Sequence, residues 1–312
     1  MNAKSDHTQL NFRAVTVADR QAIQAIGLHS GRRNCNNTFA NLIGWQTVLS
    51  TEICLLDDVF VTRYLFGRRH PAYIINAATV PDDALIMALR RRAKEEDGDG
   101  KLRLNAVEDA WAEVLKARYG ATVSVEPLRD SYDYIYRREA LEQLQGKELK
   151  AKRNHVNKFL SQHPDYHYRE LVPDDFDACQ KLTQQWREEV HHDNPWYGDT
   201  IASEHEMIER VFQHWDGLGM YGGVIIVEGR IVAFSCGAAV TDDTFDTIIE
   251  KADRNIDGAF NIINQQLAIH LPKQFRYINR EEDMGLEGLR KSKLSYHPEA
   301  LLSYNIVTFE AL

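Results

Sequence analysis

The sequence predicts an α/β protein built from two similar halves. The chain has 312 residues, which exceeds one average domain and suits two. Hydrophobic residues make up 44% and charged residues 27%, a balance typical of globular proteins. The order of strands and helices expected in the C-terminal half also recurs in the N-terminal half.

The C-terminal half begins with an expected strand over 167–172 and a pair of helices. Pro173-Asp174-Asp175 indicates a helix start, because carboxylates are favourable at the positive N-terminal end of a helix dipole. The apolar residues that follow recur at helical spacing and predict one buried face: they are Phe176, Cys179, Leu182 and Trp186. A second helix is expected over 201–215.

The pattern then changes to strands. Tyr221–Val227 and 231–240 flank the turn Glu228-Gly229-Arg230 and predict a hairpin. The remaining elements alternate. We expect a strand over 244–250, a helix over 259–271 that ends at Pro272, a strand over 275–279, a helix over 286–296 and a strand over Tyr304–Phe309.

The N-terminal half gives nearly the same order. Helices are expected over 18–28, 39–49, 81–93 and 110–119. Strands are expected over 11–15, 53–56, Val59–Tyr64, 72–75, 102–105, 123–125 and 132–136. The sequences of the halves do not repeat letter for letter, so the predicted duplication is one of topology.

These patterns divide the chain into residues 1–140, a connecting basic helix over 141–163, and residues 164–312. The polar segment 137–162 contains no Gly/Ser linker, so we expect the halves to be held rigidly.

The element order resembles the fold of GCN5-related N-acetyltransferases (GNAT), here as two tandem domains with mixed central sheets flanked by helices. The chain resembles a bacterial family with a phosphatidylglycerol lysyltransferase C-terminal-like domain, related to the aminoacyl-tRNA-dependent Fem-type transferases. The resemblance covers almost the whole chain. It rests on TFANLIGWQ (38–46), GKELKAKRNHVNKF (146–159), IEKAD (249–253) and YINREEDMGLEGLRKSKLSYHP (277–298).

This resemblance implies an acyltransferase. The most natural donor would be an aminoacyl-tRNA, and the aminoacyl group would pass to an amine or hydroxyl by direct attack. An acyl-coenzyme A (acyl-CoA)-dependent N-acyltransferase is one alternative. A non-catalytic ligand-sensing or interaction protein on the same fold is another.

The candidate catalytic residues lie in two polar stretches. Glu250 and Lys251 end an apolar strand, where a partly buried carboxylate could accept a proton from the attacking group. Arg290 and Lys293 share one helix face and could hold an anionic donor. The alternative in each case is a structural ion pair.

Candidate substrate-binding residues surround these. Asn279, Arg280, Glu281 and Asp283 follow an expected strand, at the end where open α/β sheets bind ligands, with Tyr296 on the next helix. Lys152, Arg153 and Asn154 belong to the basic segment and could contact a phosphate-bearing partner. A solvated helix between the halves is the alternative.

Acetyltransferases with this fold bind the pyrophosphate of coenzyme A on a loop at a helix N-terminus. The matching place here holds Arg254, Gly258 and Ala259, but the spacing is off by one residue and Asp257 adds negative charge. The N-terminal half has no such loop at 79–83. That half is therefore expected to be a scaffold or to bind the acceptor, and the C-terminal half to carry the active site. Acyl-CoA therefore stays an alternative to aminoacyl-tRNA as the donor.

Other classes of protein find less support. With 46 acidic and 37 basic residues, the chain is not expected to bind DNA. The scattered cysteines and the His191-His192-Asp193 run lack metal-ligand spacing, so no metal is expected. Serine-hydrolase, P-loop and dinucleotide-binding motifs are absent. Without an apolar run long enough for a signal or membrane segment, we expect a cytoplasmic chain with no integral membrane association.

Overall fold

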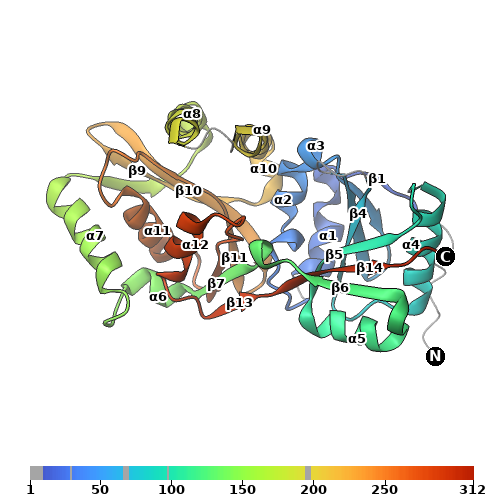
Figure 1. Cartoon of the computed structure of the whole chain (residues 1–312). Helices are drawn as coiled ribbons and strands as arrows, with labels where there is room; N and C mark the ends of the chain where they lie inside the picture. Colours follow the sequence, from blue (N-terminus) through green and yellow to red (C-terminus); the bar gives the residue numbers. More distant parts are fainter. Residues whose placement is uncertain (1–9, 29, 66–69, 97, 194–197) are drawn as a thin grey trace.

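The computed structural model describes residues 10–28, 30–65, 70–96, 98–193 and 198–312, and the side chains of 190–202 are not described. Two mixed sheets lie side by side along the molecule, each flanked by helices (Figure 1). The described residues form seven strands in each sheet. This arrangement confirms the predicted α/β class with two sheets.

The first sheet has the strand order β1-β2-β3-β4-β5-β14-β6. Its strands are β1 (Arg13–Ala14), β2 (Glu52–Leu55), β3 (Val59–Tyr64), β4 (Ala72–Ala77), β5 (Leu102–Glu108), β6 (Val123–Pro127) and β14 (Tyr304–Phe309). The α-helices of this half are α1 (Arg20–Gly27), α2 (Phe39–Gly44), α3 (Gln46–Leu49), α4 (Asp83–Glu96) and α5 (Asp109–Tyr119). Strands β4 and β5 are parallel, and the other neighbouring pairs are antiparallel.

The second sheet has the order β13-β7-β12-β11-β10-β9-β8. Its strands are β7 (Asp133–Arg137), β8 (His167–Glu170), β9 (Tyr221–Val227), β10 (Arg230–Thr241), β11 (Thr244–Ala252), β12 (Tyr277–Asn279) and β13 (Ala300–Leu302). The α-helices around it are α6 (Arg138–Gln143), α7 (Lys150–Gln162), α8 (Phe176–Asp193), α9 (Gly198–Gln213), α10 (Trp215–Leu218), α11 (Ala259–His270) and α12 (Glu287–Leu294).

The two halves exchange a strand. Strand β7 comes from the N-terminal part of the chain but pairs with β12 and β13 of the second sheet. Strand β14, at the C-terminal end of the sequence, lies between β5 and β6 of the first sheet. The sequence pattern placed 132–136 with the first half and Tyr304–Phe309 with the second. The local pattern locates both strands correctly but does not identify their partners.

Most other expected elements are present. Val59–Tyr64, Tyr221–Val227 and Tyr304–Phe309 have the predicted bounds. The polar segment 137–162 forms two helices, because Leu144 and Gly146 both adopt positive φ angles, 49° and 83°, which a continuous helix does not allow. The short strand β13 was not expected.

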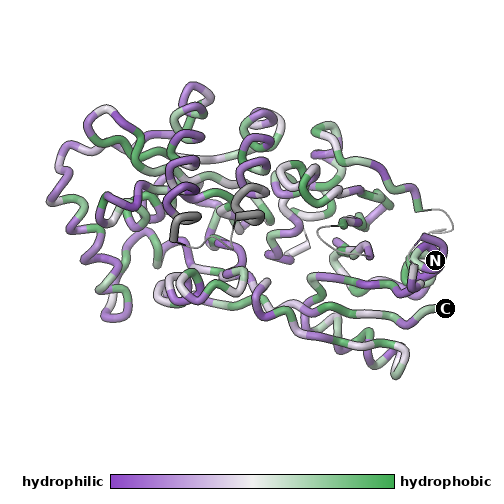
Figure 2. Tube along the Cα trace, turned by 45° about the horizontal axis from the view of Figure 1, so that its top comes forward, coloured by the Kyte–Doolittle hydropathy of each residue, from purple (hydrophilic) through white to green (hydrophobic). Residues whose placement is uncertain are grey.

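The hydrophobic core is continuous between the halves. One buried cluster contains Phe39 and Ile43 of α2 together with Ile208 and Val211 of α9. Gly44 makes this contact close, because a Cβ there would lie 3.0 Å from side-chain atoms of Met207 and Val211. A second cluster joins β7, β9, β10 and β12 to α6, α7 and α11. Figure 2 shows hydrophobic segments along the strands and hydrophilic ones on the outer helices and loops.

Two sequence expectations concern membrane-spanning segments and the cysteines. Within the described part, no helix is both long and apolar enough to cross a membrane. All four cysteines are buried free thiols.

Candidate functional site

The second sheet opens where β11 and β12 separate. The strands pair in parallel over only three residues, Thr244–Asp246 with Tyr277–Asn279. Strand β11 then continues to Ala252 paired with β10 but not with β12. A bulge in β11 accompanies this opening, since Cys236 opposes Ile249 whereas Gly237 opposes Thr247. A Cβ at Gly237 would lie 1.7 Å from the Asp246 carbonyl oxygen, so this close approach requires glycine. Bulges recur beside functional sites because they redirect side chains.

An ion pair bridges the opening. Arg280 Nη2 donates to Glu250 Oε1 at 2.7 Å, and both side chains are 13% exposed. Asn264 Nδ2 of α11 donates to the other Glu250 oxygen at 3.3 Å. Neither Arg280 Nη1 nor Asn264 Oδ1 has a hydrogen-bond partner among the described residues, although both atoms are buried. The pair is therefore fixed on one side and retains unused donor and acceptor capacity on the other.

A second cation and two tyrosines complete this side of the sheet. Lys152 Nζ of α7 lies 4.2 Å from the ring centre of Tyr296, and the Arg280 guanidinium lies 5.0 Å from the same ring. Burial, together with the nearby Arg280 charge, lowers the pKa of Lys152. Arg280 also lies 5.7 Å from the Tyr136 ring. We call Glu250, Arg280, Lys152 and Tyr296 the strand-opening site.

An acidic cluster lies on the other side of the loop that follows β12, against the first half. It consists of Asp133, Asp246, Glu281 and Glu282. Thr38 Oγ1 donates to Asp246 Oδ2 at 2.6 Å. Asn41 Nδ2 of α2 donates to Asp246 Oδ2 at 3.2 Å and to Glu281 Oε1 at 2.8 Å. Asp246 is completely buried, whereas Glu281 and Glu282 are partly exposed.

Burial and mutual repulsion shape the ionisation of this cluster. Burial raises the pKa of Asp246 well above its usual range, and the Asp133 and Glu282 charges raise it further. Burial is also the largest cause of the raised pKa of Glu281, followed by the Asp246 charge. The pKa of Glu282 is raised by burial and then by Asp133. The cluster thus favours protons or an added positive charge.

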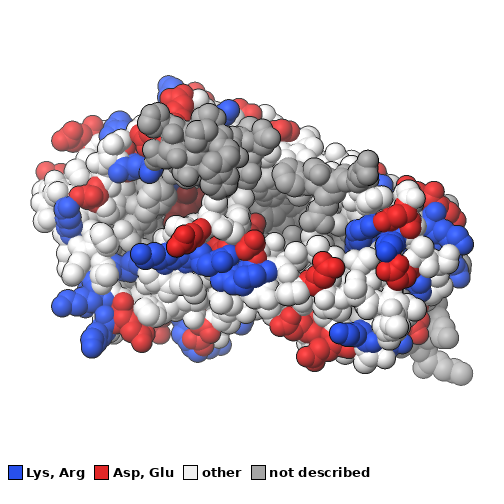
Figure 3. Space-filling view, in the orientation of Figure 1, with Lys and Arg blue, Asp and Glu red and all other residues white. Residues whose placement is uncertain are grey.

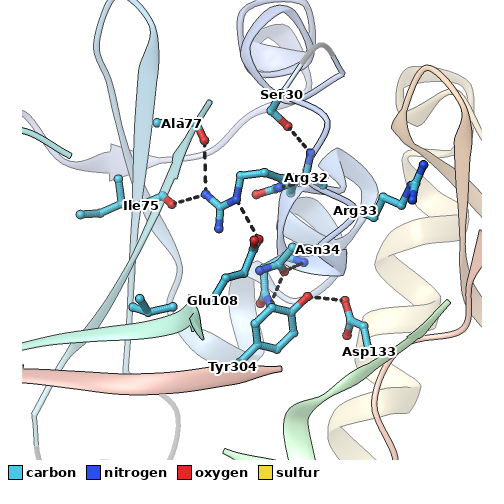
Figure 4. Close-up of polar contacts among 12 residues, drawn as sticks. Ser30, Arg32, Arg33, Asn34, Ile75, Ala77, Glu108, Asp133 and Tyr304 are labelled. Atoms are coloured by element: carbon cyan, nitrogen blue, oxygen red, sulfur yellow. Dashed lines mark hydrogen bonds and ion pairs between the residues drawn. The ribbon is translucent and has the colours of Figure 1, made fainter. Parts of the chain in front are cut away.

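Asp133 differs from Asp246 in its partners. Its carboxylate accepts hydrogen bonds from Cys35 N and Asn279 Nδ2, both at 2.8 Å, from Tyr304 Oη at 2.9 Å, and from the Cys35 thiol at 3.3 Å. Tyr304 begins β14, so this bond also ties the two exchanged strands together (Figure 4). Burial raises the pKa of Asp133 despite these donors.

Lys293 supports the loop after β12. Its ammonium donates to the carbonyl oxygens of residues 280, 281 and 282. Glu281 has a φ of 55°, and such a conformation in a non-glycine residue is found mainly where the surroundings enforce it. Lys293 is 8% exposed, and burial lowers its pKa. The three carbonyls account for its three N–H donors, so its visible role is to position Arg280 and Glu281.

Asp283 and Arg290 form a separate ion cluster. Asp283 Oδ2 accepts from Tyr134 Oη at 2.5 Å and from Arg129 Nη1 and Arg290 Nε, both at 2.9 Å. These donors outweigh burial and hold the pKa of the Asp283 carboxyl well below its usual range. Arg290 also binds Asp130 at 2.7 Å. The structure therefore separates Arg290 from the Glu250–Arg280 pair.

Lys251 points to the opposite face of β11 from Glu250. Its ammonium is 2.8 Å from both carboxylate oxygens of Glu204 and 3.7 Å from the centre of the Trp186 ring. Lys251 is 4% exposed. These contacts join the strand to α8 and α9, and they fit the structural ion pair that the sequence left open.

The loop expected to bind a pyrophosphate packs against α7. Gly258 has a φ of 81°, and a Cβ there would lie 2.5 Å from the carbonyl oxygen of His155. Lys158 of α7 pairs with Asp257. Ala259, the first residue of α11, is buried, and Arg254 is exposed. Helix α7 thus lies against the N-terminus of α11, where the resemblance places a pyrophosphate.

The other basic residues of α7 have different surroundings. Arg153 Nη1 donates to the carbonyl oxygens of Leu144 and Gly146 and stabilises the end of α6, while Asn154 is exposed. Figure 3 shows a row of Lys and Arg side chains across the second half, beside a hollow in this face. Of the three predicted residues of α7, Lys152 alone joins the strand-opening site.

The corresponding opening in the first sheet is filled by an arginine (Figure 4). Arg32 Nη1 donates to the carbonyl oxygens of Ile75 and Ala77 at 3.3 Å each, and Nε donates to Glu108 at 2.9 Å. The guanidinium lies 4.0 Å from the centre of the Trp111 ring. An internal side chain therefore occupies the place between β4 and β5 that corresponds to the strand-opening site.

Among the described residues, Cys35, Asp133 and Glu282 have ligand atoms within 4.8 Å of one another. Burial raises the pKa of the Cys35 thiol well above its usual range, and the oxygens of Asp133 already accept four hydrogen bonds. These residues therefore do not suit a metal ion, which needs deprotonated, uncommitted ligands. The side chains of His191, His192 and Asp193 lie outside the described residues.

The structure brings together part of the predicted site. Glu250, Arg280, Lys152 and Tyr296 meet at the strand opening, and Asn279 and Glu281 line the acidic cluster. Sequence reasoning missed Asn41, Thr38, Asp133 and Asp246. Two signals were available: the carboxylate of Asp246 within the apolar strand TFDTIIE, and the segment TFANLIGWQ, which contains Thr38 and Asn41. The contributions of Thr38 and Asn41 depend on contacts between the halves, which a local pattern does not reveal.

The chain matches the family model described as phosphatidylglycerol lysyltransferase, C-terminal, over residues 29–307. A conserved protein from Bacteroides thetaiotaomicron is 35% identical, with a TM-score of 0.90 and coverage of 97% of this chain and 100% of that one.

Two more distant structures share the fold. The C-terminal domain from Agrobacterium fabrum that is named for lysylphosphatidylglycerol synthetase is 13% identical, with a TM-score of 0.62 and coverage of 94% and 92%. A tandem GNAT protein from the clavulanic acid biosynthesis pathway is 10% identical, with a TM-score of 0.51 and coverage of 97% and 99%. The expected tandem GNAT-like fold is confirmed.

Proposed function

Because this chain belongs to the phosphatidylglycerol lysyltransferase C-terminal family, we propose that it transfers an aminoacyl group from an aminoacyl-tRNA to an amine or hydroxyl. Family and fold together support acyl or aminoacyl transfer as the broad class of reaction. The observation that carries the finer proposal is Arg280, which Glu250 fixes on one side while the buried Nη1 has no partner in the described part of the chain.

In this proposal the reaction is a direct displacement. The lone pair of the acceptor nitrogen or oxygen forms a bond to the ester carbonyl carbon, and the bond from that carbon to the ribose oxygen breaks. Glu250 takes the proton from the attacking group and returns it to the ribose oxygen. Its carboxylate has lone pairs to spare beside the bonds to Arg280 and Asn264.

Arg280 stabilises the charge that develops on the carbonyl oxygen. A donor that is already held in place, in a site partly shielded from water, lowers the barrier because it needs no reorganisation when the charge appears. Lys152 supplies a second positive charge for a phosphate near the acceptor end of the tRNA. Lys293 acts on Arg280 as a positioning residue through the loop. Glu250, besides its role as the base, holds Arg280 through the ion pair.

The N-terminal half serves as a scaffold that also contributes to the site. Its own strand opening is filled by Arg32, which supports a non-catalytic role for that opening. Its helix α2 supplies Asn41 to the acidic cluster. The packing of α7 against Gly258 supports aminoacyl-tRNA over acyl-CoA as the donor.

The test uses the full chain with tRNA charged with labelled amino acids and acceptor fractions from a bacterial extract, one lipid and one water-soluble. We expect label to reach an acceptor, and Arg280→Met to reduce kcat about 100-fold or more, as for loss of an oxyanion donor. Arg276→Gln is the matched control, because Arg276 is an exposed cation just before the other end of β12.

Two outcomes would overturn the proposal. Transfer by Arg280→Met at the wild-type rate would remove Arg280 from the mechanism. Transfer from acyl-CoA thioesters and not from charged tRNA would assign a different donor. The double variant Glu250→Gln/Arg280→Gln keeps a neutral hydrogen-bonding pair, so its thermal stability shows whether a loss of activity reflects misfolding.

A further inference from the structure

The acidic cluster contains a site built by both halves of the chain. Asp246 lies on β11, Glu281 on the loop after β12, and Asn41 on α2 of the first half. The Asn41 amide group connects the other two, since its Nδ2 lies 3.2 Å from Asp246 Oδ2 and 2.8 Å from Glu281 Oε1. The cluster is thus fixed in place by the contact between the halves.

Two buried oxygens in this site have no hydrogen-bond partner among the described residues. They are Asp246 Oδ1 and Asn41 Oδ1, on side chains that are 0% and 8% exposed. A buried acceptor without a partner costs about 1–3 kcal/mol. Two such atoms lie together here, beside a partly exposed glutamate. A ligand that donates hydrogen bonds to both would remove this cost, whereas a purely structural role leaves it uncompensated.

The nearby cation does not satisfy these oxygens. Lys293 directs its ammonium to three backbone carbonyls, so it reduces the negative charge of the cluster only at a distance. The acidic residues thus outnumber the cation of the cluster by four to one, and the three residues Asp246, Glu281 and Asn41 offer acceptors only on their unpaired sides.

We propose that Asp246, Glu281 and Asn41 bind a primary ammonium group. An ammonium has three N–H donors and no acceptor, which matches one oxygen from each of the three residues. Hydrogen bonds between charged partners are the stronger kind. A metal ion would compete with fixed donors, since Thr38 and Asn41 already donate to Asp246 Oδ2.

This inference rests on the proposed function and specifies its substrate. Arg280 and Glu281 are consecutive but point to different partners, Glu250 and Asn41. An ester whose carbonyl oxygen meets Arg280 would therefore have the acidic cluster close by for an amine. The ammonium is either the amino group of the transferred aminoacyl group or the amine of the acceptor.

Binding of small amines to the full chain tests the site without any transfer reaction. The probes are alaninamide, lysinamide and butylamine, each compared with its N-acetylated form in isothermal titration calorimetry. We expect the free amines to bind and the acetylated forms not to bind. Asp246→Asn and Glu281→Gln should each weaken binding about tenfold or more, whereas Glu287→Gln, an exposed acid on α12, should not change it.

A second arm separates the two sources of the ammonium. Competition by alaninamide or lysinamide, but not by butylamine, against charged tRNA assigns the site to the donor. Competition by butylamine against the acceptor alone assigns it to the acceptor. Either result supports the site.

The inference and the proposed function can fail separately. Equal binding of free and acetylated amines, or unchanged binding in both variants, would overturn the ammonium site even if transfer occurs. Specific amine binding without any transfer from charged tRNA would leave the ammonium site in place and overturn the proposed function.

Discussion

Two buried aspartates of the acidic cluster are expected to respond in opposite ways to the same substitution. Asp246 has one oxygen that no described residue bonds, and a pKa raised by burial. Burial also raises the pKa of Asp133, but its carboxylate accepts four hydrogen bonds, and their loss outweighs the removed cost of ionisation. We expect Asp246→Asn to stabilise the protein at pH 8 and Asp133→Asn to destabilise it.

The sign for Asp246 follows from its raised pKa. Below the unfolded pKa of about 3.9, both states are protonated and the substitution changes little. As the pH rises further, the unfolded chain ionises freely while the folded site resists ionisation. The wild type thus loses about 1.4 kcal/mol per pH unit until the folded pKa is passed. Asparagine has no such loss, and its amide oxygen can still accept from Thr38 and Asn41.

The magnitudes come from the resisted ionisation of Asp246 and from the hydrogen bonds of Asp133. Replacing a carboxyl that resists ionisation with a neutral amide should add about 1–3 kcal/mol to the free energy of unfolding at pH 8, which corresponds to about one to two pH units of resisted ionisation. In Asp133→Asn, an NH₂ group would face donors and lose about two of the four hydrogen bonds. This change should cost about 2–4 kcal/mol.

Urea unfolding at pH 5 and pH 8, followed by the fluorescence of the five tryptophans, measures both effects. The gain for Asp246→Asn should be larger at pH 8 than at pH 5. Equal destabilisation of the two variants at pH 8, or a gain for Asp246→Asn that shrinks with rising pH, would refute this account of the cluster.

Three other substitutions test separate parts of the structure. Glu250→Gln alone should destabilise the protein by about 3 kcal/mol, because it leaves Arg280 without its charge partner. The double variant Glu250→Gln/Arg280→Gln should recover part of this loss. Strictly additive effects of the two substitutions in thermal unfolding would contradict a direct pair. Gly258→Ala should lower Tm and increase hydrogen exchange in α7. The reason is that the new Cβ would lie 2.5 Å from the His155 carbonyl oxygen, at a residue whose φ is positive. An unchanged Tm would show that α7 is not held at this contact. Arg32→Ala should lower the free energy of unfolding by about 2–4 kcal/mol, because the carbonyl oxygens of Ile75 and Ala77 lose their hydrogen-bond donor. The kcat of transfer at low temperature should not change. A matching loss of kcat would show that the opening between β4 and β5 takes part in the reaction.

The sequence predicts the elements well because their signals are local. Strand alternation and helix periodicity locate Val59–Tyr64 and Tyr221–Val227 with the observed bounds. The break at Leu144 was missed because leucine favours helices, and here the surrounding packing imposes a positive φ. The exchange of β7 and β14 was missed because a strand carries no local label for its partner.

The candidate site shows the same contrast between local signals, which the sequence reveals, and long-range contacts, which it does not. Glu250 and Arg280 could be selected because each is a charged residue at the end of an apolar strand. Arg290 and Lys293 were selected with equal reason, but their partners, Asp283 and three backbone carbonyls, depend on the fold of the 280–285 loop. The part played by Asn41 depends on a contact between residues 240 positions apart, which no single segment could indicate.

The exchanged strands have a consequence for cutting the chain. A break in the α6–α7 connection would yield two fragments, each carrying a strand that completes the sheet of the other. Neither fragment alone could close its sheet, since β14 lies between β5 and β6 and β7 between β12 and β13. Mixed together, the fragments would have every strand available in the right place. A chain cut at this connection should therefore reassemble, with each fragment supplying one strand to the sheet of the other.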